Sequence, residues 1–169
     1  TNFNCSTMPK ISVVIPLYNK EKSIASTLRT VLNQTFSDYE IVIVNDGSTD
    51  NTASMCKQFE IKYDNVMVIN QENSGPSAAR NRGIIEAKGD YITFIDAEDT
   101  VESYWLENYI DILKNQAFDV IISGYRSIKR YKEKNDKNFT YIKSKIPGEI
   151  GTRSKYFDSI STLISEGLF

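Results

Sequence analysis

Three acidic residues, Asp96, Glu98 and Asp99, directly follow the apolar run "YITFI". Carboxylates this close repel one another unless solvent, a cation or a hydrogen-bond donor compensates. The chain contains no histidine, and the cluster suits a hard divalent cation, which takes its other ligands from water and substrate phosphates. Asp96 and Glu98 fall on the same side if strand geometry continues through them. These two are therefore the candidate metal ligands, whereas a capping turn before the next helix accounts for Asp99.

A further acidic residue, Asp46, ends another apolar run in the motif "VNDGSTD". The glycine after it permits a tight turn, and turn formation with helix capping is one interpretation of the motif. The other interpretation is functional. A carboxylate at a sheet edge accepts a hydrogen bond from a ligand N–H group, as it would in reading a nucleobase.

Two arginines, Arg80 and Arg82, follow in "GPSAARNRG", where Gly75 and Pro76 turn the chain into a helix. They lie two positions apart, about 200 degrees around a helix, so at most one of them faces a given site. We expect Arg80 to face the site and to contact phosphate oxygens. A surface arginine without a ligand is the alternative.

These residues must be positioned by short β-branched runs that alternate with helical patterns. The runs that predict strands are 11–16, 40–45, 65–70, 91–96 and 118–123. The segments that predict helices are 21–34, 50–63, 76–88 and 102–115. The strand runs are continuously apolar, so we expect both faces of the sheet to be covered. The alternation predicts an α/β domain with a mostly parallel sheet.

Ligands of such sheets bind beyond the carboxyl ends of the strands, which is where the unusual residues stand. No glycine lies between residues 10 and 46. The turn after the first strand therefore holds neither the G-x-G-x-x-G motif of dinucleotide-binding proteins nor a P-loop. A bound diphosphate would have to be neutralised by other groups.

The composition is that of an ordinary globular domain, with 40% hydrophobic and 25% charged residues among 169. A net charge of −2 argues against a nucleic-acid binder. The absence of histidine excludes Ser-His-Asp and Cys-His catalysis, and Cys5 and Cys56 match no metal-ligand spacing. No apolar run approaches the roughly 18 residues of a membrane span. We expect a cytoplasmic protein in which residues 1–10 are a flexible lead-in.

The chain changes character after residue 124. Segment 125–145 carries eight lysine and arginine residues against two acidic ones. A solvated hairpin or loop accounts for this, or else a basic surface for an acceptor phosphate or for anionic lipids at the inner face of the membrane. The apolar residues of "STLISEGLF" need partners that do not follow in the sequence. We therefore expect residues 125–169 to be the truncated start of an acceptor-side region.

Taken together, these motifs resemble the family 2 glycosyltransferases, which have the nucleotide-sugar-binding GT-A (Rossmann-like) fold, a mostly parallel sheet flanked by helices. The matching motifs are P-x-Y-N at 16–19, N-D-G-S-T-D at 45–50, A-R-N-x-G at 79–83 and D-x-E at 96–98. The resemblance is good from residue 10 to residue 115 and weaker afterwards. It implies that residues 11–124 form the nucleotide-sugar-binding domain.

The resemblance also implies roles for individual residues. Donor binding falls to Pro16, Leu17, Tyr18, Asp46, Arg80, Asp96 and Ala97, and the metal ion, Mn²⁺ or Mg²⁺, falls to Asp96 and Glu98. Pro16 to Tyr18 would line the nucleobase pocket, and Asp46 would bond the N–H of the base, most often uracil. Two positions depart from the family pattern. Asn45 stands where an acid is common, and Glu98 replaces the usual aspartate, which moves the carboxylate by roughly an ångström or more.

The implied reaction transfers a sugar from a UDP-sugar, with inversion, to a glycan or lipid-linked acceptor in cell-surface polysaccharide synthesis. The metal ion offsets charge on the leaving diphosphate, and a general base deprotonates the acceptor hydroxyl. No acid near the end of the chain matches the family's base motif, so we assign no catalytic residue and expect the base beyond Phe169. Two alternatives stay open: a metal-dependent nucleotidyltransferase, and a non-catalytic nucleotide-binding or interaction module.

Overall fold

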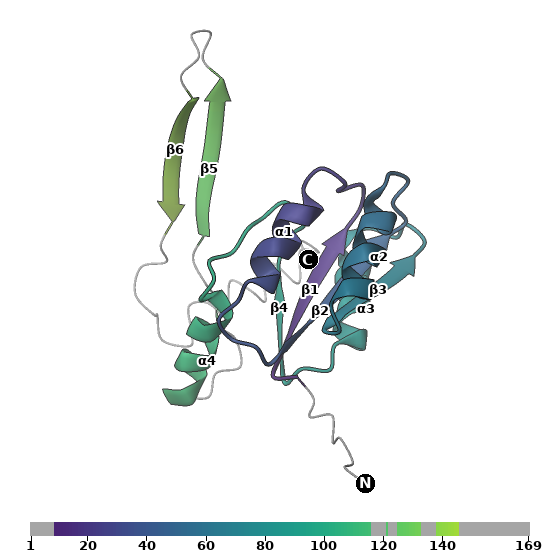
Figure 1. The fold of residues 1–169 in the computed structure, drawn as a ribbon, viewed down its shortest axis with the longest axis horizontal. Coiled ribbons are helices and arrows are strands. Elements are labelled where there is room, and N and C mark those ends of the chain that lie inside the picture. Colours follow the sequence, from purple (N-terminus) through teal and green to yellow (C-terminus); the bar gives the residue numbers. More distant parts are fainter. Residues whose placement is uncertain (1–8, 116–120, 122–124, 133–137, 146–169) are drawn as a thin grey trace. The chain divides into compact units, whose positions relative to one another are not determined.

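The structure is a computed structural model that describes residues 9–115, 121, 125–132 and 138–145 (Figure 1). These residues belong to two units, divided after Ala117. The first unit contains the parallel sheet and its helices, and the second contains a hairpin. Among the described residues, no helix is long and apolar enough to cross a membrane.

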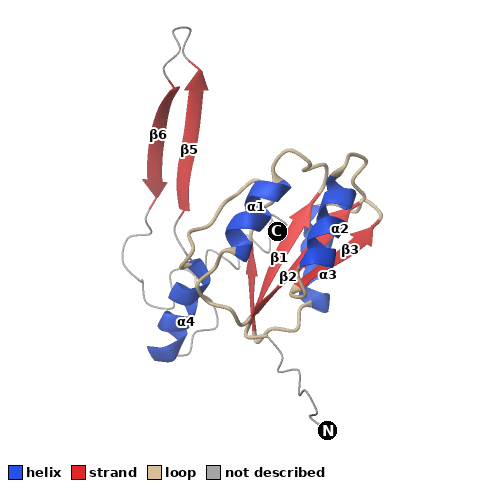
Figure 2. Ribbon diagram, in the orientation of Figure 1, coloured by secondary structure: helices blue, strands red, loops and turns tan. Residues whose placement is uncertain are grey.

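Four parallel strands form the sheet of the first unit, in the order β3-β2-β1-β4. The strands are β1 (Ile11–Leu17), β2 (Tyr39–Asp46), β3 (Val66–Gln71) and β4 (Tyr91–Phe94). Their arrowheads point to the same edge of the sheet (Figure 2). The four strands expected from the apolar runs of this unit are confirmed, and so is the α/β fold with a parallel sheet. The fifth expected strand, 118–123, lies outside the described residues apart from residue 121.

All four expected helices are present, each shorter than its sequence pattern. They are α1 (Ile24–Leu32), α2 (Thr52–Lys62), α3 (Pro76–Glu86) and α4 (Trp105–Asn115). Pro76 opens α3, where its missing N–H costs no hydrogen bond. This helix ends at Glu86 rather than at Gly89, because Ala87 takes an extended backbone with ψ near 135°.

The core is divided between the two faces of the sheet. On one face, alternate residues of β1 and β2 pack against α1, α2 and α4, with Leu28, Cys56 and Leu106 completely buried. On the other face, Val14 and β2 pack against Ala79 of α3. Burial of each such aliphatic side chain contributes about 1.5–3 kcal/mol. Helix α3 comes close to β1 at Gly83, where an added Cβ would lie 2.3 Å from Val14 Cγ1.

The expectation of a sheet covered on both faces holds for the central strands but is wrong for β4 within the described residues. Strand β1 is buried at every position. In β4, Ile92 and Phe94 are 38% and 41% exposed. Helix α3 packs over β1 and β2, on the same face as these two side chains, so it leaves β4 uncovered there.

The second unit is an antiparallel hairpin of β5 (Tyr125–Lys132) and β6 (Asn138–Lys145), paired from Tyr125–Lys145 to Lys132–Asn138. The pairing of residues 125–132 with 138–145 agrees with the hairpin expected as one interpretation of the basic segment, and a role as a basic binding surface stays a prediction. Residues 1–8 of the expected lead-in lie outside the described residues, and so do all residues after 145.

Candidate nucleotide-binding site

A pocket of about 460 Å³ opens at the carboxyl edge of the parallel sheet. Its lining comes from the ends of β1 and β2, from the loops after β1, β3 and β4, and from the first turns of α3: Pro16, Leu17, Tyr18, Lys20, Asp46, Asn73, Pro76, Arg80, Asp96, Ala97 and Glu98. The structure therefore brings together every donor-binding and metal-binding residue expected from the sequence. Their roles toward a ligand stay predictions. Tyr18 is 44% exposed, so part of this aromatic side chain is open to a ligand in the pocket.

Asp46, at the end of β2, is only 3% exposed and is already bonded to protein donors. Its Oδ1 accepts from Gln71 Nε2 at 2.7 Å and from the Ser74 N–H at 2.8 Å, and its Oδ2 accepts from the Gly75 N–H at 2.8 Å. A carboxylate offers about four acceptor positions. Asp46 thus holds the loop between β3 and α3 in place, and these three bonds leave about one acceptor position unfilled.

The neighbours of Asp46 explain why an amide and a glycine flank it. Asn45 is 4% exposed, donates from Nδ2 to Asn70 Oδ1 at 2.8 Å and accepts from the Ser48 N–H at 3.2 Å. An acid at position 45 could not make the first of these bonds as a donor. Gly47 has φ 71°, and an added Cβ would lie 2.7 Å from the Asn73 backbone nitrogen. The departure at Asn45 is therefore a structural link between β2 and β3.

The structure places Arg80, and not Arg82, at the pocket. Arg80 donates to Asp96 Oδ1 at 3.0 Å, whereas Arg82 pairs with Glu86 one helical turn further along α3, at 2.8 Å. The spacing argument, which allowed one of the two arginines to face the site, agrees with this arrangement.

Asp96 and Glu98 both line the pocket, but the reason expected from the sequence is wrong. Strand β4 ends at Phe94, and the Asp99 N–H bonds the Asp96 carbonyl at 2.9 Å, which closes a turn. Ala97, 2% exposed, anchors this turn in the core. The pKa of Asp99 is raised, mainly by burial and then by the charges of Asp96 and Glu98, as expected for acids this close together.

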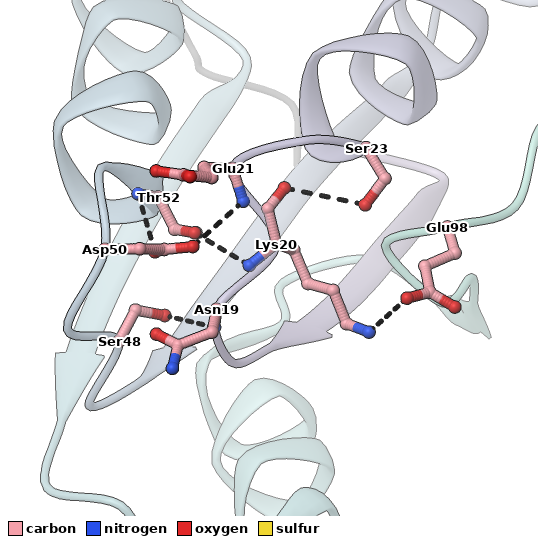
Figure 3. A network of polar contacts seen from close by, with 8 residues as sticks. All are labelled: Asn19, Lys20, Glu21, Ser23, Ser48, Asp50, Thr52 and Glu98. Atoms are coloured by element: carbon pink, nitrogen blue, oxygen red, sulfur yellow. Dashed lines mark hydrogen bonds and ion pairs between the residues drawn. The ribbon is translucent and has the colours of Figure 1, made fainter.

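Lys20 is the functional candidate that the sequence reasoning missed. It follows β1, and its Nζ forms an ion pair with Glu98 Oε1 (Figure 3). Its backbone N–H donates to Thr52 Oγ1 at 2.8 Å. The sequence has no signal that separates Lys20 from the exposed Lys22, because the path of the turn decides which lysine faces the pocket.

A network of hydrogen bonds between two loops fixes that path (Figure 3). Asn19 has the left-handed φ of 51° and donates its N–H to Ser48 Oγ at 2.9 Å. Its Oδ1 accepts from the Thr49 N–H at 2.8 Å. The Glu21 N–H donates to Asp50 Oδ2 at 3.3 Å. The loop after β1 is therefore fastened to the loop after β2.

The acidic side chains of the pocket limit the kind of metal site that it can form. Among residues 9–115, 121, 125–132 and 138–145, no group of three or more Asp, Glu, Cys or His could hold a metal ion. Asp96 and Glu98 supply two carboxylates at one pocket. Two carboxylates suit Mg²⁺ or Mn²⁺ that completes its coordination with water and substrate phosphates.

Comparison with known proteins identifies the family of the chain. The family model "Glycosyl transferase family 2" matches residues 12–163. Glycosyltransferase GlyA of Streptococcus pneumoniae is 41% identical over 119 residues, which are 70% of this chain and 17% of that protein. The poly(ribitol-phosphate) beta-glucosyltransferase of Bacillus spizizenii is 40% identical over 123 residues, 70% of this chain and 19% of that protein.

A solved structure gives the same result for the fold. The crystal structure of S. aureus TarS 1-349 in complex with UDP matches with a TM-score of 0.60 and 32% identity, and covers 63% of this chain and 32% of that one. The complex of the same protein with UDP-GlcNAc matches with a TM-score of 0.59. The chain thus spans about a third or less of the length of each of these proteins. It belongs to glycosyl transferase family 2, and its parallel sheet is that of the GT-A fold.

Proposed function

We propose that the pocket binds the nucleotide part of a UDP-sugar, and that the protein transfers the sugar with inversion to a glycan or lipid-linked acceptor in cell-surface polysaccharide synthesis. One observation carries the proposal. A single pocket combines an aromatic wall at Tyr18 and a buried carboxylate acceptor at Asp46 with two cations and two exposed acids. A nucleobase needs the first pair of features, and a diphosphate with a metal ion needs the second.

The relatives support the choice of donor and acceptor. TarS has been crystallised with UDP and with UDP-GlcNAc, and the similar Bacillus protein is named for glucosyl transfer to poly(ribitol phosphate). The first observation supports a uridine nucleotide as the donor, and the second supports a polymer as the acceptor. We extend them to this chain because its pocket lies where a nucleotide-sugar-binding sheet presents its ligand.

In the reaction that we propose, the acceptor hydroxyl attacks the anomeric carbon while the bond to the diphosphate breaks. Arg80 neutralises charge on the leaving diphosphate, and Asp46 keeps the base oriented through its remaining acceptor position. A metal ion bound by Asp96 and Glu98 would add Lewis-acid stabilisation of the same charge. We assign no general base among the residues of this chain and expect it in the acceptor-side region, beyond Phe169.

The proposed setting is the cytoplasmic face of a membrane. The basic segment 125–145, whose backbone is the β5–β6 hairpin, has the composition to approach anionic lipid headgroups or an acceptor phosphate. Residues 11–124 would act as the donor-binding domain.

Calorimetric titration with UDP and GDP, each with and without Mn²⁺, tests the proposal. We expect UDP to bind more tightly than GDP and to bind more tightly with Mn²⁺. Glu98→Ala should remove most of the gain from Mn²⁺ and change binding little without metal. Glu102→Ala, an exposed acid outside the pocket lining, is the matched control.

Two results would contradict the proposal. The absence of Mn²⁺-dependent UDP binding would favour a non-catalytic interaction module. A loss in Glu98→Ala that is equal with and without Mn²⁺ would remove Glu98 from the metal site. If UDP binds as expected, hydrolysis of UDP-sugars by a longer form of the protein is the next measurement.

A further inference from the structure

Two ion pairs cross the pocket, and in both the cation is more covered than the acid. Lys20 pairs with Glu98, and their side chains are 33% and 65% exposed. Arg80 pairs with Asp96 at 3.0 Å, with side chains 31% and 63% exposed. The protein therefore surrounds the two cations, whereas the two carboxylates extend into solvent.

Lys20 is held by contacts that do not involve Glu98. Its N–H bonds Thr52 Oγ1 at 2.8 Å, and its carbonyl accepts from the Ser23 N–H at 3.1 Å and the Ile24 N–H at 3.0 Å. Glu98 stands on an exposed turn, and Lys20 is the only partner recorded for its carboxylate among the described residues. These contacts fix the backbone of Lys20, and its side chain extends from there to Glu98 (Figure 3).

The backbone of the first turn is not available to bind phosphate. The N–H groups of Asn19, Lys20 and Glu21 donate to Ser48 Oγ, Thr52 Oγ1 and Asp50 Oδ2. In a glycine-rich loop these backbone groups would cradle the phosphates. Here they hold two loops together, so neutralisation of a diphosphate has to come from side chains at the pocket.

The Lys20–Glu98 pair is weak enough to be exchanged. A solvent-exposed pair of this kind contributes little to stability, because water competes for both charges. A divalent cation carries twice the charge of the Lys20 ammonium group and prefers carboxylate oxygens. An anionic phosphate oxygen offers Lys20 a replacement for the carboxylate it gives up.

We propose that Lys20 is the resident counter-ion of Glu98 and moves to a phosphate oxygen of the donor when a divalent cation takes Glu98. The proposal rests on the proposed function, since it assigns Lys20 to the same nucleotide site. It has a distinctive consequence. Removing the Lys20 charge should strengthen binding of the metal ion alone and weaken binding of the nucleotide when the metal ion is present.

Lys20→Met tests this, because methionine keeps an unbranched apolar side chain and removes the charge. Mn²⁺ binding without nucleotide is followed by the electron paramagnetic resonance signal of free Mn²⁺, and UDP binding at saturating Mn²⁺ by calorimetry. We expect Mn²⁺ to bind about three- to fivefold more tightly, as loss of a competing exposed ion pair allows, and UDP to bind about fivefold or more weakly. Lys22→Met, at an exposed lysine two residues away, should change neither affinity.

Lys20→Arg keeps the charge and should restore UDP binding. Unchanged Mn²⁺ affinity in Lys20→Met would overturn the competition with Glu98, and unchanged UDP affinity would overturn the phosphate contact. A fall in both affinities would also overturn the proposal, because it is the result expected if Lys20 only holds the loop. Wild-type protein that binds no UDP under any condition would refute the proposed function instead, while the Mn²⁺ titration would still decide whether Lys20 competes for Glu98.

Discussion

Replacing Asp46 by asparagine should destabilise the folded domain as well as change its ligand preference. The side chain is 3% exposed and accepts three hydrogen bonds, from Gln71, Ser74 and Gly75. Asparagine has nearly the same shape, but one of its two terminal atoms is a donor. If its oxygen keeps the Gln71 and Ser74 bonds, its NH₂ group faces the Gly75 N–H, and two donors then oppose each other.

The magnitude follows from these three contacts. A buried donor left without a partner costs about 1–3 kcal/mol. The two remaining bonds lose the charge of the acceptor, which lowers each from about 1.5–3 to about 0.5–1.5 kcal/mol. Because the loop can relax in part, we expect Asp46→Asn to lower the free energy of unfolding by about 2–4 kcal/mol.

Urea unfolding followed by circular dichroism measures this change, and Asp96→Asn is the matched control. The control makes the same chemical substitution at a carboxylate that is 63% exposed and has one ion pair, with Arg80. Its stability should stay within about 0.5 kcal/mol of wild type. Both variants should bind UDP less well, but only Asp46→Asn should change the ratio of UDP to GDP affinity.

An Asp46→Asn variant as stable as wild type would refute this account of the loop. Loss of UDP binding alone would not show that Asp46 contacts the nucleobase. The loop that Asp46 holds supplies Asn73 to the pocket and leads into Pro76, which also lines it. The ratio of UDP to GDP affinity is therefore the measurement that reports whether Asp46 recognises the nucleobase.

Two further substitutions test the scaffold. Thr27 Oγ1 is buried and has no hydrogen-bond partner in the described part of the chain, so Thr27→Val should leave the unfolding free energy unchanged or raise it by about 1 kcal/mol; a clear loss in urea titration would mean that the hydroxyl is bonded. Hydrogen bonds from Lys57 and from the Val68 N–H lower the pKa of Glu60 below its ordinary value. The Glu60 carboxylate therefore stabilises the fold at pH values above its pKa in the unfolded chain. This contribution is lost as the pH falls through the lower pKa of the folded state. Glu60→Gln should therefore reduce the acid-induced shift of the urea midpoint, and an identical shift in both proteins would contradict this role.

The order of elements and the place of the site could be predicted because both follow from apolar patterning. The runs at 11–16 and 40–45 are buried on both faces in the structure, and continuous burial is what makes such runs readable. Parallel strands end at one edge, so residues that follow different strands had to meet there. The uncovered face of β4 could not be predicted, because the sequence does not give the strand order or the place of α3.

The geometry of the acidic turn and the role of Lys20 were also beyond the sequence. The Asp99–Asp96 backbone bond ends strand geometry at a point where the residue types suit either a strand or a turn. Which lysine faces the pocket depends on the left-handed backbone of Asn19 and on its bonds to residues about thirty positions away. Contacts of this range are made by the folded chain, and no local pattern records them.

The longer side chain at position 98 and the missed lysine are parts of one feature. In the sequence, Glu98 departs from the aspartate that the family usually has. Its longer side chain moves the carboxylate away from the position that an aspartate would offer to a metal ion. In the structure its carboxylate reaches Lys20, whose backbone is fixed by the loop after β2. The acid therefore has a partner before any ligand arrives, and its repulsion from Asp96 is reduced by the two cations that the pocket supplies. An acidic cluster that looked as if it needed a metal ion to be tolerable is already compensated by the protein, so a metal ion has to compete for it.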